Sequence, residues 1–370
     1  MRFTGVRVTL LVSFALVTVG GSWVQASAQD RPAPSGGFHG FQFDVHGGFL
    51  SVGRITAGTS ELPAPGPTFM TFQNLPSRYV PSWYFGDGAL LANQVTTAMG
   101  ITNRIAPLDA MLTSASGGRK NGGSFGLRIG HSITRHVLGE FNLDIGEGHL
   151  AFGRAALADI EAARASFTTY FDAVLARSAN AGNPRTSSTA TVVNDMGKQM
   201  AMTGDVAINI RSVAGLTPYV TLGGGIVLPQ GGAPTATLVG TYDFVLNVPG
   251  NPNNGSPFHA ADQVLVQLRA RPALITVVGT GVQRDLSRHF GFRADIRVLL
   301  RATDLVLDVY TAPVNTPANP AARIVRGPGP QLHFSNTDAF PSSLSMPIGF
   351  RTFSGIGRQV EMSAAYFVRF

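Results

Sequence analysis

The sequence predicts an all-β protein, an eight-stranded antiparallel transmembrane β-barrel with long extracellular loops. Three observations support this fold class. Eight segments alternate apolar and polar residues, the connections between them alternate between short and long, and the last segment runs to the final residue, Phe370. Alternation with a period of two places successive side chains on opposite faces of a strand. Short turns at one rim and long loops at the other are typical of a barrel that separates two compartments.

The strand segments are read from this alternation. In FQFDVHGGF, Phe41 and Phe43 share one face and Asp44 lies on the other. In HFGFRADIRVLLR, apolar residues from Phe290 to Leu300 alternate with a polar face of Arg and Asp. We expect strands near residues 40–53, 123–133, 137–150, 200–211, 216–228, 273–286, 289–302 and 357–370.

The long connections are residues 54–122, 151–199, 229–272 and 303–356. The second contains ALADIEAARASFTTYFDAVLARSA, whose apolar residues recur at helical spacing, and we expect an amphipathic helix folded over the barrel mouth. In the third, residues 235–248 and 263–270 also alternate, which would give ten strands if both crossed the membrane. Only Arg271 and Pro272 are left for a turn before the next strand, so we interpret this region as an extended hairpin.

The amino-terminal segment resembles a secretory signal peptide. Arg2 and Arg7 precede an apolar run from Val8 to Val19, and VQASA supplies a small-residue site with cleavage expected after Ala28. The apolar run is too short for a membrane-spanning helix. We therefore expect residues 1–28 to be removed and residues 29–370 to form a single barrel domain.

Composition excludes several classes of site. The 370 residues include no cysteine, so a disulfide framework, a thiolate zinc site and a cysteine nucleophile are excluded. The net charge of +7 is spread along the chain, which does not support nucleic-acid binding. The eight histidines show no paired spacing typical of a metal site, and we expect neither a metal nor another cofactor.

The final strand carries the clearest motif. Apolar residues alternate up to the terminal aromatic, a pattern that resembles the carboxy-terminal assembly signal of bacterial outer-membrane β-barrels. The resemblance assigns this signal to Met362, Ala364, Tyr366, Val368 and Phe370. It implies a location in the bacterial outer membrane, insertion by the barrel-assembly machinery, and outer-membrane lipid and lipopolysaccharide as partners.

The stretch GTGVQRDLSRHFGFRADIRVLL, in which one strand passes through a tight polar turn into the next, resembles the small OmpA/OmpX-like outer membrane protein β-barrel family. An eight-stranded barrel is only wide enough for its own side chains. We therefore expect the inward charges to form a paired network that fills the lumen. The expected members are Asp44, Arg128, Glu140, Asp144, Asp205, Arg293, Asp295, Arg297, Arg301 and Glu361.

One stretch suggests catalysis. LHFSN is similar to the His-x-Ser-Asn element of outer-membrane lipid A deacylases, which would make His333 a base and Ser335 a nucleophile. No Asp or Glu lies between Phe340 and Gln359 to orient the histidine. We interpret the stretch as a polar loop strand and expect no catalytic site.

The expected function is non-enzymatic. We expect a role in envelope structure, or in surface recognition or adhesion through the large loops. The alternatives are a narrow, porin-like passive channel for small or apolar solutes and a lipid A-modifying hydrolase.

Overall fold

The structure is a computed structural model of the 370-residue chain, and it describes residues 40–55, 57–64, 68–70, 76–80, 82–114, 116–250, 254–302, 305–311, 331–334 and 347–370. The expected signal peptide, residues 1–28, lies outside these ranges. Residues Phe38–Phe370 form one compact unit.

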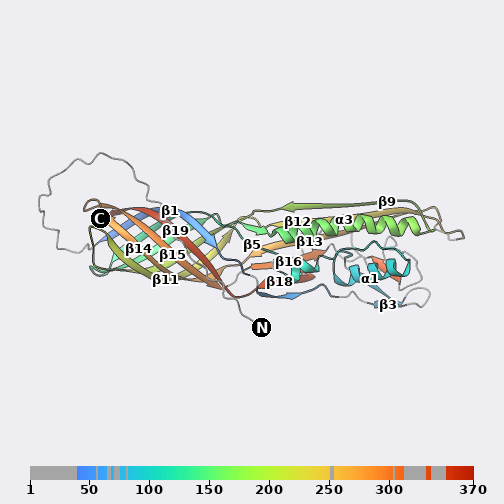
Figure 1. Cartoon of the computed structure of the whole chain (residues 1–370), viewed down its shortest axis with the longest axis horizontal. Helices are drawn as coiled ribbons and strands as arrows, with labels where there is room; N and C mark the ends of the chain where they lie inside the picture. The colour runs from blue at the N-terminus through green and yellow to red at the C-terminus, as the bar shows by residue number, and fades with distance from the viewer. Residues whose placement is uncertain are drawn as a thin grey trace, which may run out of the picture. The chain divides into compact units, whose positions relative to one another are not determined.

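Eight strands close into an antiparallel barrel, which confirms the predicted fold class (Figure 1). Around the barrel the order is β1-β19-β15-β14-β11-β10-β7-β6. The strands are β1 (Phe41–Val52), β6 (Gly122–Ser132), β7 (Val137–Gly146), β10 (Lys198–Asn209), β11 (Thr217–Gln230), β14 (Ala273–Asp285), β15 (Phe290–Ala302) and β19 (Ile356–Arg369). The first and last strands form the closing seam, in which Val45 lies opposite Tyr366.

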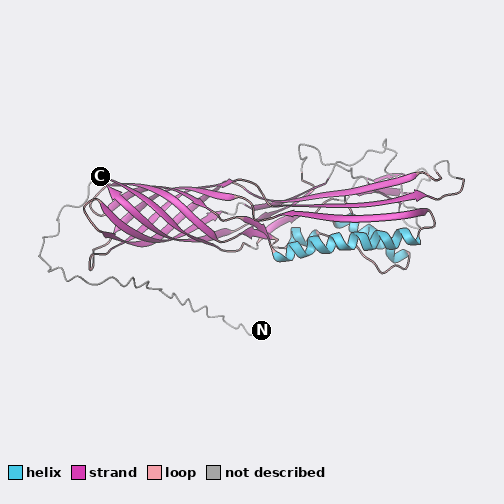
Figure 2. Ribbon diagram, turned by 90° about the horizontal axis from the view of Figure 1, so that it is seen from above, coloured by secondary structure: helices cyan, strands magenta, loops and turns pink. Residues whose placement is uncertain are grey.

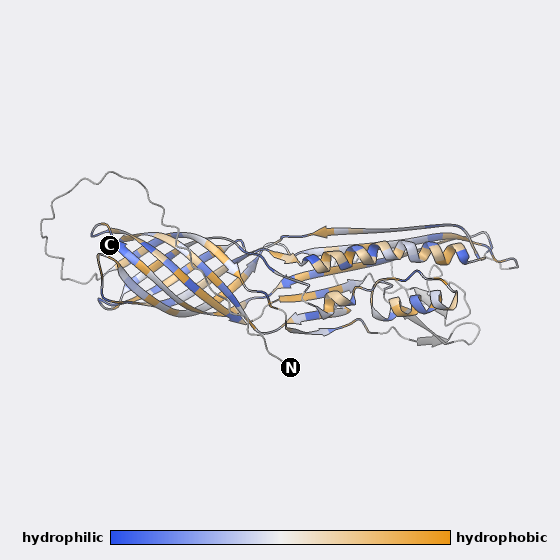
Figure 3. Cartoon of the chain, in the orientation of Figure 1, coloured by the Kyte–Doolittle hydropathy of each residue, from blue (hydrophilic) through white to orange (hydrophobic). Residues whose placement is uncertain are grey.

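Apolar and polar residues alternate along the barrel strands, as Figure 3 shows by colour. In β1, Phe41 and Phe43 are exposed on the outside, whereas Gln42 and Asp44 are buried inside. The same parity holds in β19, where Tyr366 is exposed and Phe367 is buried. The sequence period of two therefore fixes which side chains fill the lumen.

The long connections contain a second sheet, which the sequence analysis did not predict. Its order is β2-β18-β16-β13-β12-β9. These strands are β2 (Gly58–Glu61), β18 (Gly349–Phe353), β16 (Leu305–Thr311), β13 (Pro257–Ala270), β12 (Thr235–Leu246) and β9 (Ala181–Val193). β12 and β13 pair with each other as a hairpin and are not barrel strands, so the barrel has eight strands and the ten-strand alternative is wrong.

In the described part of these long connections there are three helices: α1 (Gly86–Ala98), α2 (Asp109–Thr113) and α3 (Arg154–Arg177). They lie on one side of the extended strands (Figure 2). The expectation that the long helix covers the barrel mouth is wrong, because α3 packs on β9 and β12. Its Phe171 stacks on Tyr242 of β12, with 4.3 Å between ring centroids. Phe167 lies over Gly240, where an added Cβ would be 2.5 Å from the ring.

The aromatic stretch of the first long connection contributes to the same core. Trp83, Tyr84 and Phe85 are buried, and Tyr84 stacks on Phe167 at 5.1 Å between centroids. These rings therefore pack the protein's own interior. Two smaller sheets are also present among the described residues. One contains the three strands β3 (Thr68–Met70), β4 (Pro76–Val80) and β17 (Gln331–Phe334). The other pairs β5 (Gly117–Arg119) with β8 (Leu150–Phe152).

No helix in the described ranges is both long enough and apolar enough to span a membrane.

Three consecutive glycines of β11, Gly223, Gly224 and Gly225, permit close packing against the neighbouring strand β10. A Cβ added to Gly225 would lie 1.9 Å from the backbone oxygen of Met202, whereas one added to Gly204 of β10 would have no atom within 4 Å. Glycine inside a strand often marks such a close approach.

We predict that Gly225→Ala destabilises the barrel by about 1–3 kcal/mol, because the methyl group meets backbone that cannot move aside. The measurement is the urea midpoint for loss of heat-modifiable mobility on gels. Gly204→Ala is the matched control and should leave the midpoint unchanged. Equal midpoints for the two variants would contradict the close approach.

Candidate functional site

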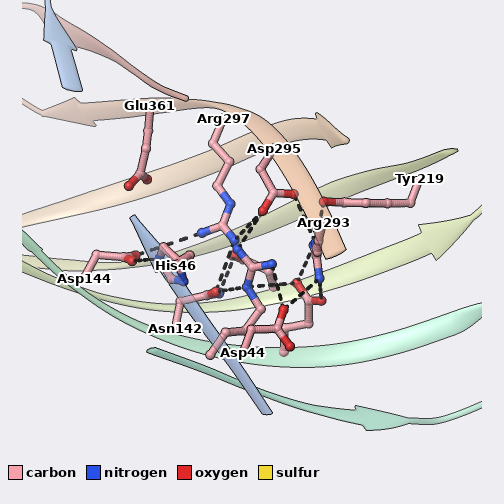
Figure 4. Close-up of polar contacts among 12 residues, drawn as sticks. Asp44, His46, Asn142, Asp144, Tyr219, Arg293, Asp295, Arg297 and Glu361 are labelled. Carbon is pink, nitrogen blue, oxygen red and sulfur yellow. Dashed lines mark hydrogen bonds and ion pairs between the residues drawn. The ribbon is translucent and has the colours of Figure 1, made fainter. Parts of the chain in front are cut away.

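The polar network in the barrel lumen is the candidate site. All ten predicted lumen residues are at most 7% exposed. They come from β1, β6, β7, β10, β15 and β19, so the network draws on six of the eight barrel strands. Figure 4 shows part of this network, with the labelled side chains of Asp44, Asp144, Arg293, Asp295, Arg297 and Glu361 projecting into the same space.

Arg128 lies at the centre of the network. From β6, its Nη2 donates to Asp295 of β15 at 3.0 Å and its Nη1 donates to Asp44 of β1 at 3.3 Å. β6 and β15 are not neighbours in the barrel, so the bond to Asp295 crosses the lumen. Its Nε donates to Asn142 Oδ1 at 2.5 Å. Arg128 is 1% exposed, and all three of its guanidinium nitrogens have acceptors.

Arg293 makes the second ion pair that crosses the lumen. It donates through Nη1 and Nη2 to both carboxylate oxygens of Glu140, which is on β7 at the opposite side of the barrel. Its Nε lies 3.0 Å from Asp295 Oδ1, and its guanidinium carbon lies 4.1 Å from the centroid of the Tyr219 ring. Bidentate arginine–carboxylate pairs are among the stronger polar contacts and fix geometry.

Neutral side chains connect these charges, and the sequence analysis missed them. Asn142 accepts from Arg297 Nη2 at 3.2 Å and donates to Asp205 at 2.8 Å. Nearer the long-connection rim, Gln199 accepts from Arg301 at 3.4 Å and donates to Gln359 at 3.1 Å. Asn142 lies at an even position between Glu140 and Asp144, so the strand period of two predicts that its side chain also points inward. This period was the signal that could have identified it.

An apolar layer adjoins this amide pair. Val227, Ile275 and Leu299 are buried there together with Ala201 and Val277. A lumen filled by ion pairs, amides and this apolar layer has little room for a continuous column of water.

His46 is another inward residue that the sequence analysis did not select. Its Nε2 lies 2.5 Å from Asp144 Oδ1, and Ser124 donates to the nearby Glu361 at 2.9 Å. Ligand atoms of His46, Asp144 and Glu361 all lie within 4.8 Å of one another. In Figure 4 this group lies beside the arginine network.

The outer barrel surface is apolar. The aromatic residues near the short-connection rim are at least 37% exposed: Phe41, Phe43, Phe290, Phe292, Tyr366 and Phe370. Their rings also contact one another, with 5.4 Å between the centroids of Phe292 and Tyr366. The residues assigned to the assembly signal share this outward face of β19 and its end, and the backbone N–H of Phe370 donates to Phe41 at 3.0 Å. Their recognition by an assembly machinery stays a prediction.

The catalytic alternative falls mostly outside the described structure. His333 belongs to β17, whereas Ser335 lies in a range that the structure does not describe.

No protein-family model and no curated protein sequence matches this chain. Among solved structures, the outer membrane protein AlkL, determined by solid-state NMR in DMPC bilayers, is 10% identical, with 93% of this chain and 97% of AlkL covered and a TM-score of 0.30. The CymD monoaromatic hydrocarbon channel is 9% identical over 90% of this chain and 89% of CymD, with a TM-score of 0.18. The P. putida toluene transporter TodX is 8% identical over 91% of each chain, with a TM-score of 0.17. At these scores the likeness carries no weight for function, and the resemblance to the OmpA/OmpX-like family stays an expectation.

The lumen network predicts a specific stability pattern. Arg293→Met should lower the free energy of unfolding by about 3–5 kcal/mol, because the buried Glu140 carboxylate loses its bidentate partner and keeps only Arg128, whose Nε lies 3.8 Å away. The double variant Arg293→Met with Glu140→Met should recover much of this loss, since both charges are then gone. The measurement is urea unfolding of the refolded protein in detergent micelles.

Arg164→Met is the matched control for this series. Arg164 pairs with Glu161 three residues earlier on the surface of α3, where the pair is solvated. Exposed pairs contribute little, so this variant should unfold like the original protein. A double variant as unstable as Arg293→Met alone would show that the pair itself is not what the lumen requires.

Proposed function

We propose that this protein is an outer-membrane β-barrel whose barrel is a closed anchor and whose function, surface recognition or adhesion, lies in the folded region formed by the long connections. The single observation that carries this proposal is the pair of ionic crossings in the lumen, Arg128 to Asp295 and Arg293 to Glu140. A barrel filled in this way holds a protein in a membrane without opening a pore.

The outer face of the barrel supports a membrane location. Large apolar side chains on every barrel strand are exposed, among them Phe125, Phe141 and Leu222 at 52–63%. A soluble protein rarely exposes a contiguous apolar surface of this extent. A closed barrel also satisfies its backbone hydrogen bonds internally, which lipid requires. Outer-membrane lipid and lipopolysaccharide are the partners that this face would contact.

The folded region supports a role in recognition. Its core joins the first long connection, helix α3 and four strands of the second sheet, and includes Tyr84, Phe167, Val264 and Leu307. Such a core holds a surface in a fixed shape, whereas unstructured loops would present an ensemble. A rigid surface loses less conformational entropy when it binds a partner.

A narrow passive channel for small or apolar solutes is the rival function. It would require a path through the ion pairs and the apolar layer of Val227, Ile275 and Leu299. Opening such a path would break several buried charge pairs at once, which is costly. The lumen geometry therefore favours the anchor.

We predict that the purified protein produces no discrete conductance steps in planar bilayers in 1 M KCl, because the filled lumen has no ion path. Bilayers with a known porin supply the positive control. Steady, reproducible steps from the protein would contradict the closed anchor and favour the channel.

Epitope insertion tests which rim faces the outside. A tag between Asn254 and Gly255, at the tip of the β12–β13 hairpin, should bind antibody on intact cells. The same tag between Ala214 and Gly215, in the short turn before β11, is the matched control and should bind antibody only after permeabilisation. Labelling of both tags, or of neither, on intact cells would contradict the proposed orientation.

A further inference from the structure

Three side chains of types that commonly bind metal ions come from distant parts of the sequence and meet in the lumen. His46 is on β1, Asp144 on β7 and Glu361 on β19, and one ligand atom of each lies within 4.8 Å of the others. The three residues are 2%, 7% and 2% exposed. An imidazole nitrogen and two carboxylate oxygens form a donor set that suits divalent first-row metals such as zinc.

The charge of the described lumen supports a bound cation. Six carboxylates are buried inside the barrel, against four guanidinium groups, so two negative charges are unmatched when histidine is neutral. The carboxylates are those of Asp44, Glu140, Asp144, Asp205, Asp295 and Glu361, and the guanidinium groups are those of Arg128, Arg293, Arg297 and Arg301. The rim pair of Arg369 and Asp285 compensates itself and is not counted. Buried charge is costly unless it is paired or bound to a metal.

The excess negative charge is least compensated at Glu361. The ion pairs of Arg128 and Arg293 go to Asp44, Glu140 and Asp295. Within the described chain, the polar contact that Glu361 makes is the hydroxyl of Ser124. The nearest guanidinium contact of the three-residue cluster is Arg297, 3.9 Å from Asp144.

Among the described residues, several buried polar atoms of the lumen have no hydrogen-bond partner, and two of them belong to the strands of the closing seam, β1 and β19. One is Nδ1 of His46, and the other is the hydroxyl of Ser363, two residues after Glu361 on the same inward face of β19. Unpartnered buried polar atoms are rare in native proteins. Their presence here points to a ligand in this part of the lumen.

The backbone makes room for the cluster at Gly126. A Cβ at this position would lie 2.2 Å from Asp144 Oδ1 and 2.4 Å from His46 Nε2. The absence of a side chain on β6 therefore lets the imidazole and the carboxylate meet.

We propose that His46, Asp144 and Glu361 bind one divalent metal ion, with zinc as the best match to the donor set. Tetrahedral zinc bonds of about 2.0–2.2 Å place the donor atoms roughly 3.4 Å apart. On binding, the His46 and Asp144 atoms, which are 2.5 Å apart in the structure, therefore separate, and the Glu361 carboxylate turns toward them. The ion supplies the positive charge that the arginines leave missing. Because β1 and β19 form the closing seam, it also holds the first and last strands together.

The test uses the full-length mature protein refolded in detergent with zinc, then freed of unbound metal by gel filtration. We expect about one zinc per protein by elemental analysis. We also expect a zinc-dependent rise in the thermal unfolding midpoint that EDTA reverses. Magnesium at the same concentration should give no rise, because it prefers all-oxygen ligands with retained water.

Glu361→Gln removes one ligand without changing the side-chain volume, and it should reduce the zinc content from about one to near zero and abolish the zinc-dependent rise. Asp205→Asn is the matched control, since it removes a buried lumen carboxylate outside the cluster. This variant should retain about one zinc per protein and the zinc-dependent rise in the unfolding midpoint. Equal zinc content in the original protein and in Glu361→Gln overturns the proposal. The proposal is also overturned if the original protein binds no zinc and shows no zinc-dependent rise in its unfolding midpoint. In that case protons, and not a metal ion, neutralise the excess carboxylates.

Discussion

The structure depends on one constraint: an eight-stranded barrel is too narrow for bulk water, so the polar side chains inside it must be satisfied by one another or by a bound ion. Arg128 and Arg293 meet this constraint by reaching carboxylates across the barrel. Because each crossing joins strands that are not neighbours, the lumen network also holds the barrel closed. The outer face can then be mostly apolar, as a lipid-facing surface requires.

The strand period made the barrel and its inward residues predictable. Asp44 and Arg293 could be assigned to the lumen because each lies between apolar neighbours in an alternating segment. Their partners could not be assigned, since cross-lumen pairs depend on the stagger between strands that closure imposes. Asn142 and His46 share the inward parity of the network, but neither carries the fixed charge on which the expected network was based.

The second sheet was harder to predict. Its strand β16 (LVLDVYT) is buried on both faces, so it has no alternation to detect. β2 is only four residues long and is exposed throughout. The helix α3 was predictable from its apolar stripe, but a stripe does not specify its partner, and here the partner is a sheet formed from segments far apart in the sequence.

The most direct test of the closed lumen uses the absence of native cysteine. Ser363→Cys places a nearly isosteric thiol in the lumen, and Ser212→Cys places one in an exposed turn. The account predicts that a charged, water-soluble methanethiosulfonate reagent modifies the cysteine at position 212 rapidly and leaves the one at position 363 unmodified until the barrel is unfolded. Rapid modification at both positions in the folded barrel would contradict a lumen filled by its own side chains.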